Sequence, residues 1–349
     1  GMMNSGLDLS SAKSAEETAI LAYKNNFSRG NFIVGRAWNN ETWQDKSFPN
    51  KRVLDSFFPN IPVVLTRNDG HSVWCNSVAL KIAEINNLTP NPDGGYIFKD
   101  ENNEPTGILI DNAMDLVNSQ IPDFTNEQIK EFILLGLNIC EKNGITTLHD
   151  MDLSRQHIEV YKNLANNNLL KSKVFAYASA QNNQLLNGEI QPFSNNNFKI
   201  QGIKLYADGA LGSYGAALLE DYSDKIGEKG LLLISPHQIL ENCLAADELG
   251  LDVAIHAIGD NAVRTVLDGY ELFRNKKPES KINLRIEHSQ IVNQKDLGKY
   301  KKLNVIASVQ AIHFTSDVEM AFSRLGLERM INSAYPWKSF LDNDILIIA

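Results

Sequence analysis

Short apolar, β-branched runs alternate with amphipathic stretches of helical period throughout residues 126–349. The stretch FTNEQIKEFILLGLNICEKNG carries a Thr125/Gln128 capping box, which marks the start of a helix. SPHQILENCLAADELG offers Ser235 as an N-cap, and GDNAVRTVLDGYELFR begins with Asp260 as an expected cap. Strand, helix and strand at this spacing predict right-handed βαβ units in a parallel sheet. The strand candidates are GITTLHD, KVFAYAS, FKIQGIKLYADG, LDVAIHAIGD, INLRIEHSQ, NVIASVQ and DILIIA.

Polar side chains gather at the carboxyl ends of these runs. A TIM barrel carries its active site at the carboxyl ends of all its strands, whereas an open doubly wound sheet concentrates polar groups at one switch point. Spread over so many strands, the pattern predicts an α/β fold with a TIM-like (β/α)8 barrel. The polar residues concerned are His149, Lys204, Asp208, His256, His288, Gln310 and His313.

The first part of the chain does not follow this rhythm. Residues 1–125 contain short strand and helix signals, and KDENNEPTG has the turn-rich composition of a hairpin tip. We therefore expect a small α+β subdomain over residues 1–125 and the barrel over residues 126–349. The seven strand candidates are one fewer than a complete barrel needs, and the last of them reaches Ala349.

Composition narrows the class of partner. The 349 residues include 43% hydrophobic residues and carry a net charge of −9 without any basic run, which argues against nucleic acid and anionic membranes as partners. The three cysteines are unpatterned, as expected of reduced thiols in a cytoplasmic protein. No apolar run is long enough to span a membrane. A small molecule is the expected partner.

Lys204 stands inside an apolar strand, where an amine costs free energy unless a charge partner or chemistry compensates it. His256 and His288 end the next two strands, so the three side chains together predict a divalent metal site. Each also has a plainer interpretation. The histidines could be hydrogen-bonded rim residues, and the lysine could extend to the rim, form a Schiff base or take up carbon dioxide as a carbamate.

Several long segments in collinear order resemble the amidohydrolase superfamily, and within it the group that includes N-substituted formamide deformylases. The resemblance implies a metal-dependent hydrolase acting on a non-peptide C–N bond, amide or N-formyl, in a distorted TIM barrel. It implies that Lys204 is carboxylated and bridges one or two divalent ions, zinc being expected, with His256 and His288 as further ligands. The segments are IKLYADGALGSYGAALLEDYSD, VAIHAIGDNAV, RIEHSQIV, VIASVQAIHFTSD, GITTLHD and VVLTRNDGHSVWCNSVAL.

The resemblance also implies residues that face the substrate. These are Arg67, Asp69 and His71 in LTRNDGHS, Trp38 in GRAWNNETW, and His313 beyond the seventh strand. Other interpretations stay open: LTRNDGHS could be a polar turn, Trp38 a core residue of the subdomain, and His313 with Gln310 part of the rim.

The chain departs from the family pattern at both ends. It contains no His-x-His pair, and the aspartate expected after the eighth strand, a ligand and the general base, would lie beyond Ala349. We therefore expect a chain truncated at both ends, lacking the first barrel strand and the end of the eighth, with residues 1–125 inserted between barrel strands one and two. Such a fragment would hold half the metal site, with doubtful metal occupancy and little turnover.

Two further expectations follow. The open barrel edge predicts a homodimer that covers it, or an N-terminal segment folded over it. A non-catalytic, degenerate barrel acting as a binding or scaffold module remains the main alternative function, although such a module has no need of Lys204, His256 and His288 together. A metal-free Schiff-base lyase that uses Lys204 is a second alternative, and it leaves both histidines unexplained.

Overall fold

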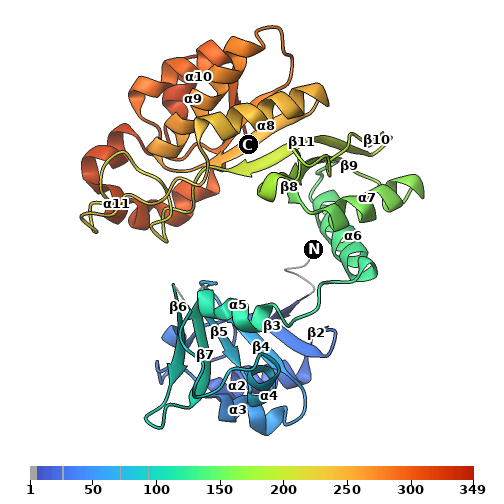
Figure 1. Ribbon diagram of the computed structural model, residues 1–349, viewed down its shortest axis with the longest axis vertical. Coiled ribbons are helices and arrows are strands. Elements are labelled where there is room, and N and C mark those ends of the chain that lie inside the picture. The colour runs from blue at the N-terminus through green and yellow to red at the C-terminus, as the bar shows by residue number, and fades with distance from the viewer. Residues whose placement is uncertain (1–5, 26, 71, 93) are drawn as a thin grey trace. The chain divides into compact units, whose positions relative to one another are not determined.

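The computed structural model describes residues 6–25, 27–70, 72–92 and 94–349 (Figure 1). The chain forms two compact units, Gly1–Ile139 and Cys140–Ala349. The division falls inside α6 (Asn126–Lys142), later than the boundary expected at residue 125. The reason is that Phe132 of α6 packs against Phe27 and Phe124, which ties the start of this helix to the first unit.

The first unit is built on a mixed sheet in the order β1-β3-β4-β5-β7-β6, with β2 paired to β3. Alternate residues of its strands enter separate cores, so that Leu65 joins one apolar cluster and Val64 the other. The expected hairpin tip is confirmed by the turn from Asp100 to Glu104 that joins β6 and β7. The elements are β1 (Leu7–Asp8), α2 (Ala15–Lys24), β2 (Ser28–Arg29), β3 (Phe32–Trp38), α3 (Lys51–Phe57), β4 (Val63–Arg67), β5 (Ser72–Cys75), α4 (Ser77–Ile82), β6 (Gly95–Lys99), β7 (Pro105–Asp111) and α5 (Asp115–Asn118).

The second unit holds a parallel sheet in the order β15-β14-β13-β12-β11-β9-β8, with the short β10 antiparallel to β11. All the strands expected from the sequence are present in this sheet. Nearly every crossover carries a helix, as βαβ units require. The elements are β8 (Thr147–Leu153), α7 (Arg155–Asn166), β9 (Lys173–Ser179), β10 (Ser194–Asn195), β11 (Phe198–Tyr206), α8 (Pro236–Glu248), β12 (Asp252–Ala257), α9 (Asp260–Lys276), β13 (Leu284–His288), α10 (Leu297–Leu303), β14 (Val305–Ser308), α11 (Ile312–Asn332), α12 (Trp337–Asp342) and β15 (Ile347–Ile348).

The sheet curls like part of a barrel. Arg285 on β13 reaches His149 on β8, with Nη1 2.7 Å from Nδ1, although three strands separate β13 from β8 in the sheet. The sequence pattern predicted His149 at the carboxyl end of its strand, and this was wrong. His149 lies in the first half of β8 and contacts Arg285 in the interior of the sheet. Within the described residues, no pairing joins β8 to β15, so this half-barrel has two edges.

Helix boundaries follow the sequence signals with one exception. The Thr125/Gln128 capping box is confirmed, because the Thr125 N–H donates to Gln128 Oε1 at 3.0 Å and the Gln128 N–H donates to Thr125 Oγ1 at 3.3 Å. Asp260 is not the cap of α9: Gly259 takes that place, and the Asp260 carboxylate accepts the Leu219 N–H at 2.9 Å.

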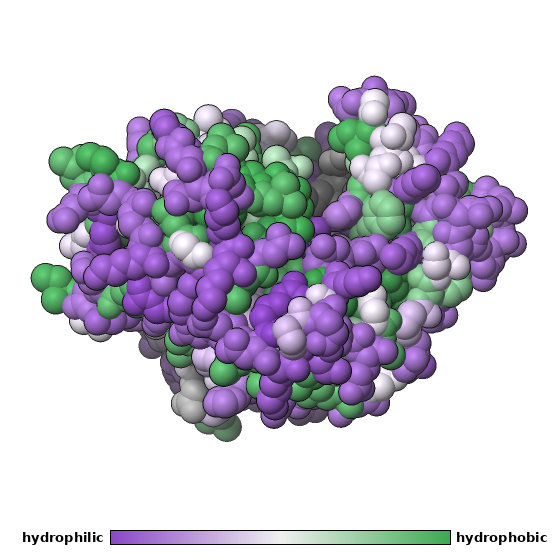
Figure 2. All heavy atoms as spheres, turned by 90° about the horizontal axis from the view of Figure 1, so that it is seen from above, coloured by the Kyte–Doolittle hydropathy of each residue, from purple (hydrophilic) through white to green (hydrophobic). Residues whose placement is uncertain are grey.

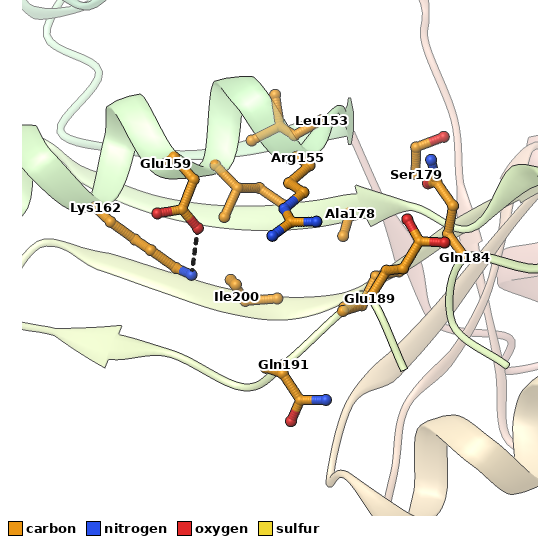
Figure 3. Close-up of a pocket in the computed structure, with 12 residues that line it drawn as sticks. Leu153, Arg155, Glu159, Lys162, Ala178, Ser179, Gln184, Glu189, Gln191 and Ile200 are labelled. Carbon is orange, nitrogen blue, oxygen red and sulfur yellow. Dashed lines mark hydrogen bonds and ion pairs between the residues drawn. The ribbon is translucent and has the colours of Figure 1, made fainter. Parts of the chain in front are cut away.

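The crossover from β9 to β11 has no α-helix in the described part of the chain, and a cavity of about 210 Å³ lies there beside α7 (Figure 3). Leu153, Ile158 and Ile200 are among its apolar lining residues. None of the candidate site residues is among the described residues that line it.

Hydrophilic side chains predominate on the face shown in Figure 2. Among the residues described, no helix combines the length and apolar character needed to cross a bilayer.

Candidate functional site

Lys204 is buried in β11, with 4% of its surface exposed. Its Nζ donates to the Leu205 carbonyl oxygen at 2.9 Å and lies 3.6 Å from the centre of the Tyr206 ring. Burial lowers the pKa of the Lys204 amine to about 8, against the opposing charges of Glu287, Asp152 and Asp208. The Lys204 amine therefore loses its proton more readily than that of an exposed lysine.

His256 and His288 lie side by side, with their ring centres 4.6 Å apart. In β12, His256 pairs with Tyr206 of β11, two residues beyond Lys204. Strict alternation along β13 would send His288 to the same face as Ile286 and opposite to Glu287. The backbone of His288 instead takes φ +75°, a left-handed conformation rare for a residue with a side chain, and this change of direction accompanies the approach to His256.

Both imidazoles are held in the neutral form. Burial lowers the pKa of His256 to about 3, and His288 and Lys204 add to this effect. Burial also lowers the pKa of His288, although its hydrogen bond with Gln310 opposes the shift. A neutral imidazole is the form that binds metal.

Hydrogen bonds leave one nitrogen of each ring available. His288 Nδ1 lies 2.7 Å from Gln310 Oε1, an amide oxygen that only accepts, so Nδ1 carries the hydrogen and Nε2 has a free lone pair. His256 Nε2 faces two acceptors, the Gly209 carbonyl oxygen and Asp208 Oδ1, each at 3.4 Å. The His256 nitrogen that faces no acceptor is therefore Nδ1.

Asp208, close to His256, joins the loop after β11 to the turn after β12. Its buried carboxylate accepts the backbone N–H groups of Ala217 at 2.9 Å, Ile258 at 3.0 Å and Gly259 at 2.8 Å. Burial raises the pKa of Asp208 to about 6, although these three bonds oppose the shift. Asp208 thereby holds the loop after β11 and the turn after β12 in one arrangement.

Replacing Asp208 with alanine should lower the free energy of unfolding by about 3 kcal/mol, because three buried N–H groups lose their acceptor. Urea unfolding measures the loss. Asp221→Ala is the matched control: its carboxylate accepts the Gly227 N–H in an exposed part of the same loop, and about 1 kcal/mol or less should be lost. Equal losses in the two variants would contradict the role assigned to Asp208.

Four further polar side chains of this site were not predicted as site residues. Tyr206 follows Lys204 by two positions on one strand face, and Arg285 and Glu287 alternate inward on β13, so strand periodicity could have indicated these three. The fourth, Asp152, comes from β8 and accepts a hydrogen bond from the Tyr206 hydroxyl at 3.0 Å. No local pattern brings Asp152 to Tyr206.

His313 does lie at the site. It stands in the first turn of α11, with its ring centre 5.5 Å from that of His288. Within the described residues, no three His, Cys, Asp or Glu side chains are arranged to hold a metal ion.

The candidate substrate residues of the first unit differ in burial and in their partners. Arg67 and Asp69 form an ion pair, and Arg67 Nε donates to Asn40 Oδ1 at 3.0 Å. Trp38 is fully buried and donates its indole N–H to the Leu65 carbonyl oxygen at 2.8 Å, which favours the core role left open for it. His71 lies outside the described residues. Whether these residues face a substrate stays a prediction.

Comparisons with known proteins agree with the motifs. The family model described as "Amidohydrolase family" matches residues 2–349. Protein LONG AFTER FAR-RED 3 of Arabidopsis thaliana is 32% identical over 336 residues, which make up 92% of this chain and 57% of that protein. An N-substituted formamide deformylase of Arthrobacter pascens is 24% identical over 282 residues, 76% of this chain and 51% of that protein. The chain thus spans between half and two thirds of the length of these relatives.

A solved structure supports the fold. The crystal structure of an uncharacterized metal-dependent hydrolase from Pyrococcus furiosus superposes with a TM-score of 0.81 at 30% identity, covering 99% of this chain and 69% of that one. The resemblance predicted from the motifs is confirmed, and so is an α/β fold with a parallel half-barrel.

Proposed function

Because this chain belongs to the amidohydrolase family, we propose that it acts as a metal-dependent hydrolase on a C–N bond of a small amide or N-formyl compound. One observation carries the proposal. Lys204, His256 and His288 come from three neighbouring parallel strands and converge at their carboxyl ends. The match to the N-substituted formamide deformylase supports the choice of substrate class.

The proposed metal ligands are Lys204, Nδ1 of His256 and Nε2 of His288. A divalent ion, with zinc the expected one, lowers the pKa of a bound water and polarises a carbonyl group when present. Gln310 keeps the hydrogen of His288 on Nδ1, and Asp208 holds the turn that carries His256. The lowered pKa of Lys204 also favours uptake of carbon dioxide, which would turn the amine into a carbamate with oxygen donors.

Metal analysis and a hydrolysis assay test the proposal together. Purified protein is expected to bind zinc weakly, measured by mass spectrometry of the metal content, and to release formate and amine from N-formyl amines slowly and only when loaded. A chelator should stop the release, and added zinc should restore it. If metal-loaded protein released no formate, the proposed metal site would stand but the proposed activity would be refuted. If the chelator left turnover unchanged, both the metal site and the metal-dependent activity would be refuted.

A non-catalytic scaffold is the second candidate. It is favoured by the absence of a three-residue cluster of His, Cys, Asp or Glu ligands within the described residues. Metal content separates the two candidates, because a scaffold has no reason to retain zinc through dialysis while the proposed site does.

A further inference from the structure

The Tyr206 ring contacts two of the proposed metal ligands. The Lys204 amine stands 3.6 Å from the centre of the Tyr206 ring, and the ring centre of His256 lies 5.3 Å from it, with the two planes inclined at 36°. Contact with the ring face limits where the Lys204 side chain can lie, whether or not the amine carries its proton. The orientation of the Tyr206 ring therefore sets where the amine rests relative to the imidazole.

Asp152 fixes the far end of this ring. The Tyr206 hydroxyl donates to Asp152 Oδ2 at 3.0 Å, which links β11 to the edge strand β8 although β9 lies between them. The second oxygen of the same carboxylate, Oδ1, is buried and has no hydrogen-bond partner among the described residues. Its negative charge opposes the effect of burial on the Lys204 amine.

The backbone of β8 is distorted where it presents Asp152. The pairing of β8 with β9 shifts between Asp150 and Leu153, so that one extra residue is accommodated in β8 as a bulge. Asp152 itself takes φ +62°, a conformation that is uncommon for a residue with a side chain. Bulges near the ends of barrel strands re-aim side chains, and strained residues persist where the surrounding structure requires them.

We propose that Asp152 and Tyr206 act as a positioning pair for Lys204. Asp152 holds the Tyr206 ring, and the ring holds the amine beside His256. The proposal rests on the proposed function only in treating Lys204 as a metal ligand. It predicts that removal of the Tyr206–Asp152 hydrogen bond weakens metal binding although no ligand has been removed.

The position of the amine can be followed without metal. In metal-free protein with ¹³C-labelled lysine, the ε-methylene resonance of Lys204 is expected to be shifted upfield by the Tyr206 ring current, and Lys204→Arg identifies it. Asp152→Ala and Tyr206→Phe should move the resonance toward those of exposed lysines. Asp152→Asn should restore the wild-type position, because an amide oxygen still accepts the hydroxyl. A resonance unmoved in Asp152→Ala and Tyr206→Phe would overturn the proposal.

Metal affinity gives the second measurement. In competition with a chromogenic zinc chelator, Asp152→Ala and Tyr206→Phe should each bind zinc about 10- to 100-fold more weakly, and the double variant no more weakly than either. Tyr161→Phe is the matched control. Tyr161 of α7 donates its hydroxyl hydrogen to Oδ2 of Asp150, another residue of β8, at 2.7 Å. The zinc affinity of this variant should equal that of the wild type. Wild-type affinity in both test variants refutes the pair. Wild-type affinity in Lys204→Met refutes the proposed ligand set instead.

Discussion

Replacing Lys204 with methionine is expected to abolish divalent-metal binding while the protein stays folded and at least as stable as the wild type. The side chains have similar length, and methionine removes the cost of a buried amine whose pKa burial has lowered to about 8. The neighbouring carboxylates are not orphaned by the change, because each keeps another partner. These partners are Arg285 for Glu287, Tyr206 for Asp152, and the Ala217, Ile258 and Gly259 N–H groups for Asp208.

Metal content and urea unfolding measure the two halves of this prediction. The free energy of unfolding is expected to stay the same or to rise, because the variant no longer bears the cost of a buried amine. Lys199→Met removes a lysine from the same strand further from its carboxyl end and should leave metal content unchanged. Wild-type metal content in Lys204→Met would show that Lys204 is not a ligand.

Replacing Arg285 with methionine is expected to lower the free energy of unfolding by about 3–5 kcal/mol, because the buried Glu287 carboxylate would lose its ion-paired guanidinium. Arg285 Nε lies 2.9 Å from Glu287 Oε1, an ion pair whose atoms do not align as a hydrogen bond. Both side chains are about 5% exposed, so solvent screens the pair little. The guanidinium also contacts His149, donates to the Tyr177 hydroxyl at 3.3 Å and donates to Ser308 Oγ at 3.1 Å.

A double-mutant cycle isolates the pair. Arg285→Met combined with Glu287→Leu should recover much of the lost stability, since an apolar replacement of both partners is often close to neutral. Lys338→Met tests a surface counterpart: Lys338 pairs with Asp342 at 2.6 Å, their side chains are 84% and 58% exposed, and about 1 kcal/mol or less should be lost. Additive losses in the cycle would mean that Arg285 and Glu287 do not act as a pair.

Local patterns in the sequence specify the strands of the second unit, because apolar periodicity depends only on which face of an element is buried. The same alternation places Lys204 and His256 on one face, two positions apart in register, and the capping box at Thr125 follows from chemistry within one turn of helix. The family, too, is recognisable from the sequence, since its motifs are continuous segments.

The tertiary structure decides what depends on contacts between distant segments. Alternation alone would turn His288 away from His256, and its left-handed backbone is set by the turn it enters. Asp152 reaches Tyr206 through a bulge in β8 that no local pattern indicates. Trp38 lies in a core, the alternative that the sequence left open beside the substrate contact implied by the family resemblance. The sequence by itself thus determined the strands and the family, and it pointed to Lys204, His256 and His288 as candidate ligands. Packing across the curled sheet decided which side chains meet, because such contacts depend on register and curvature and not on spacing along the chain.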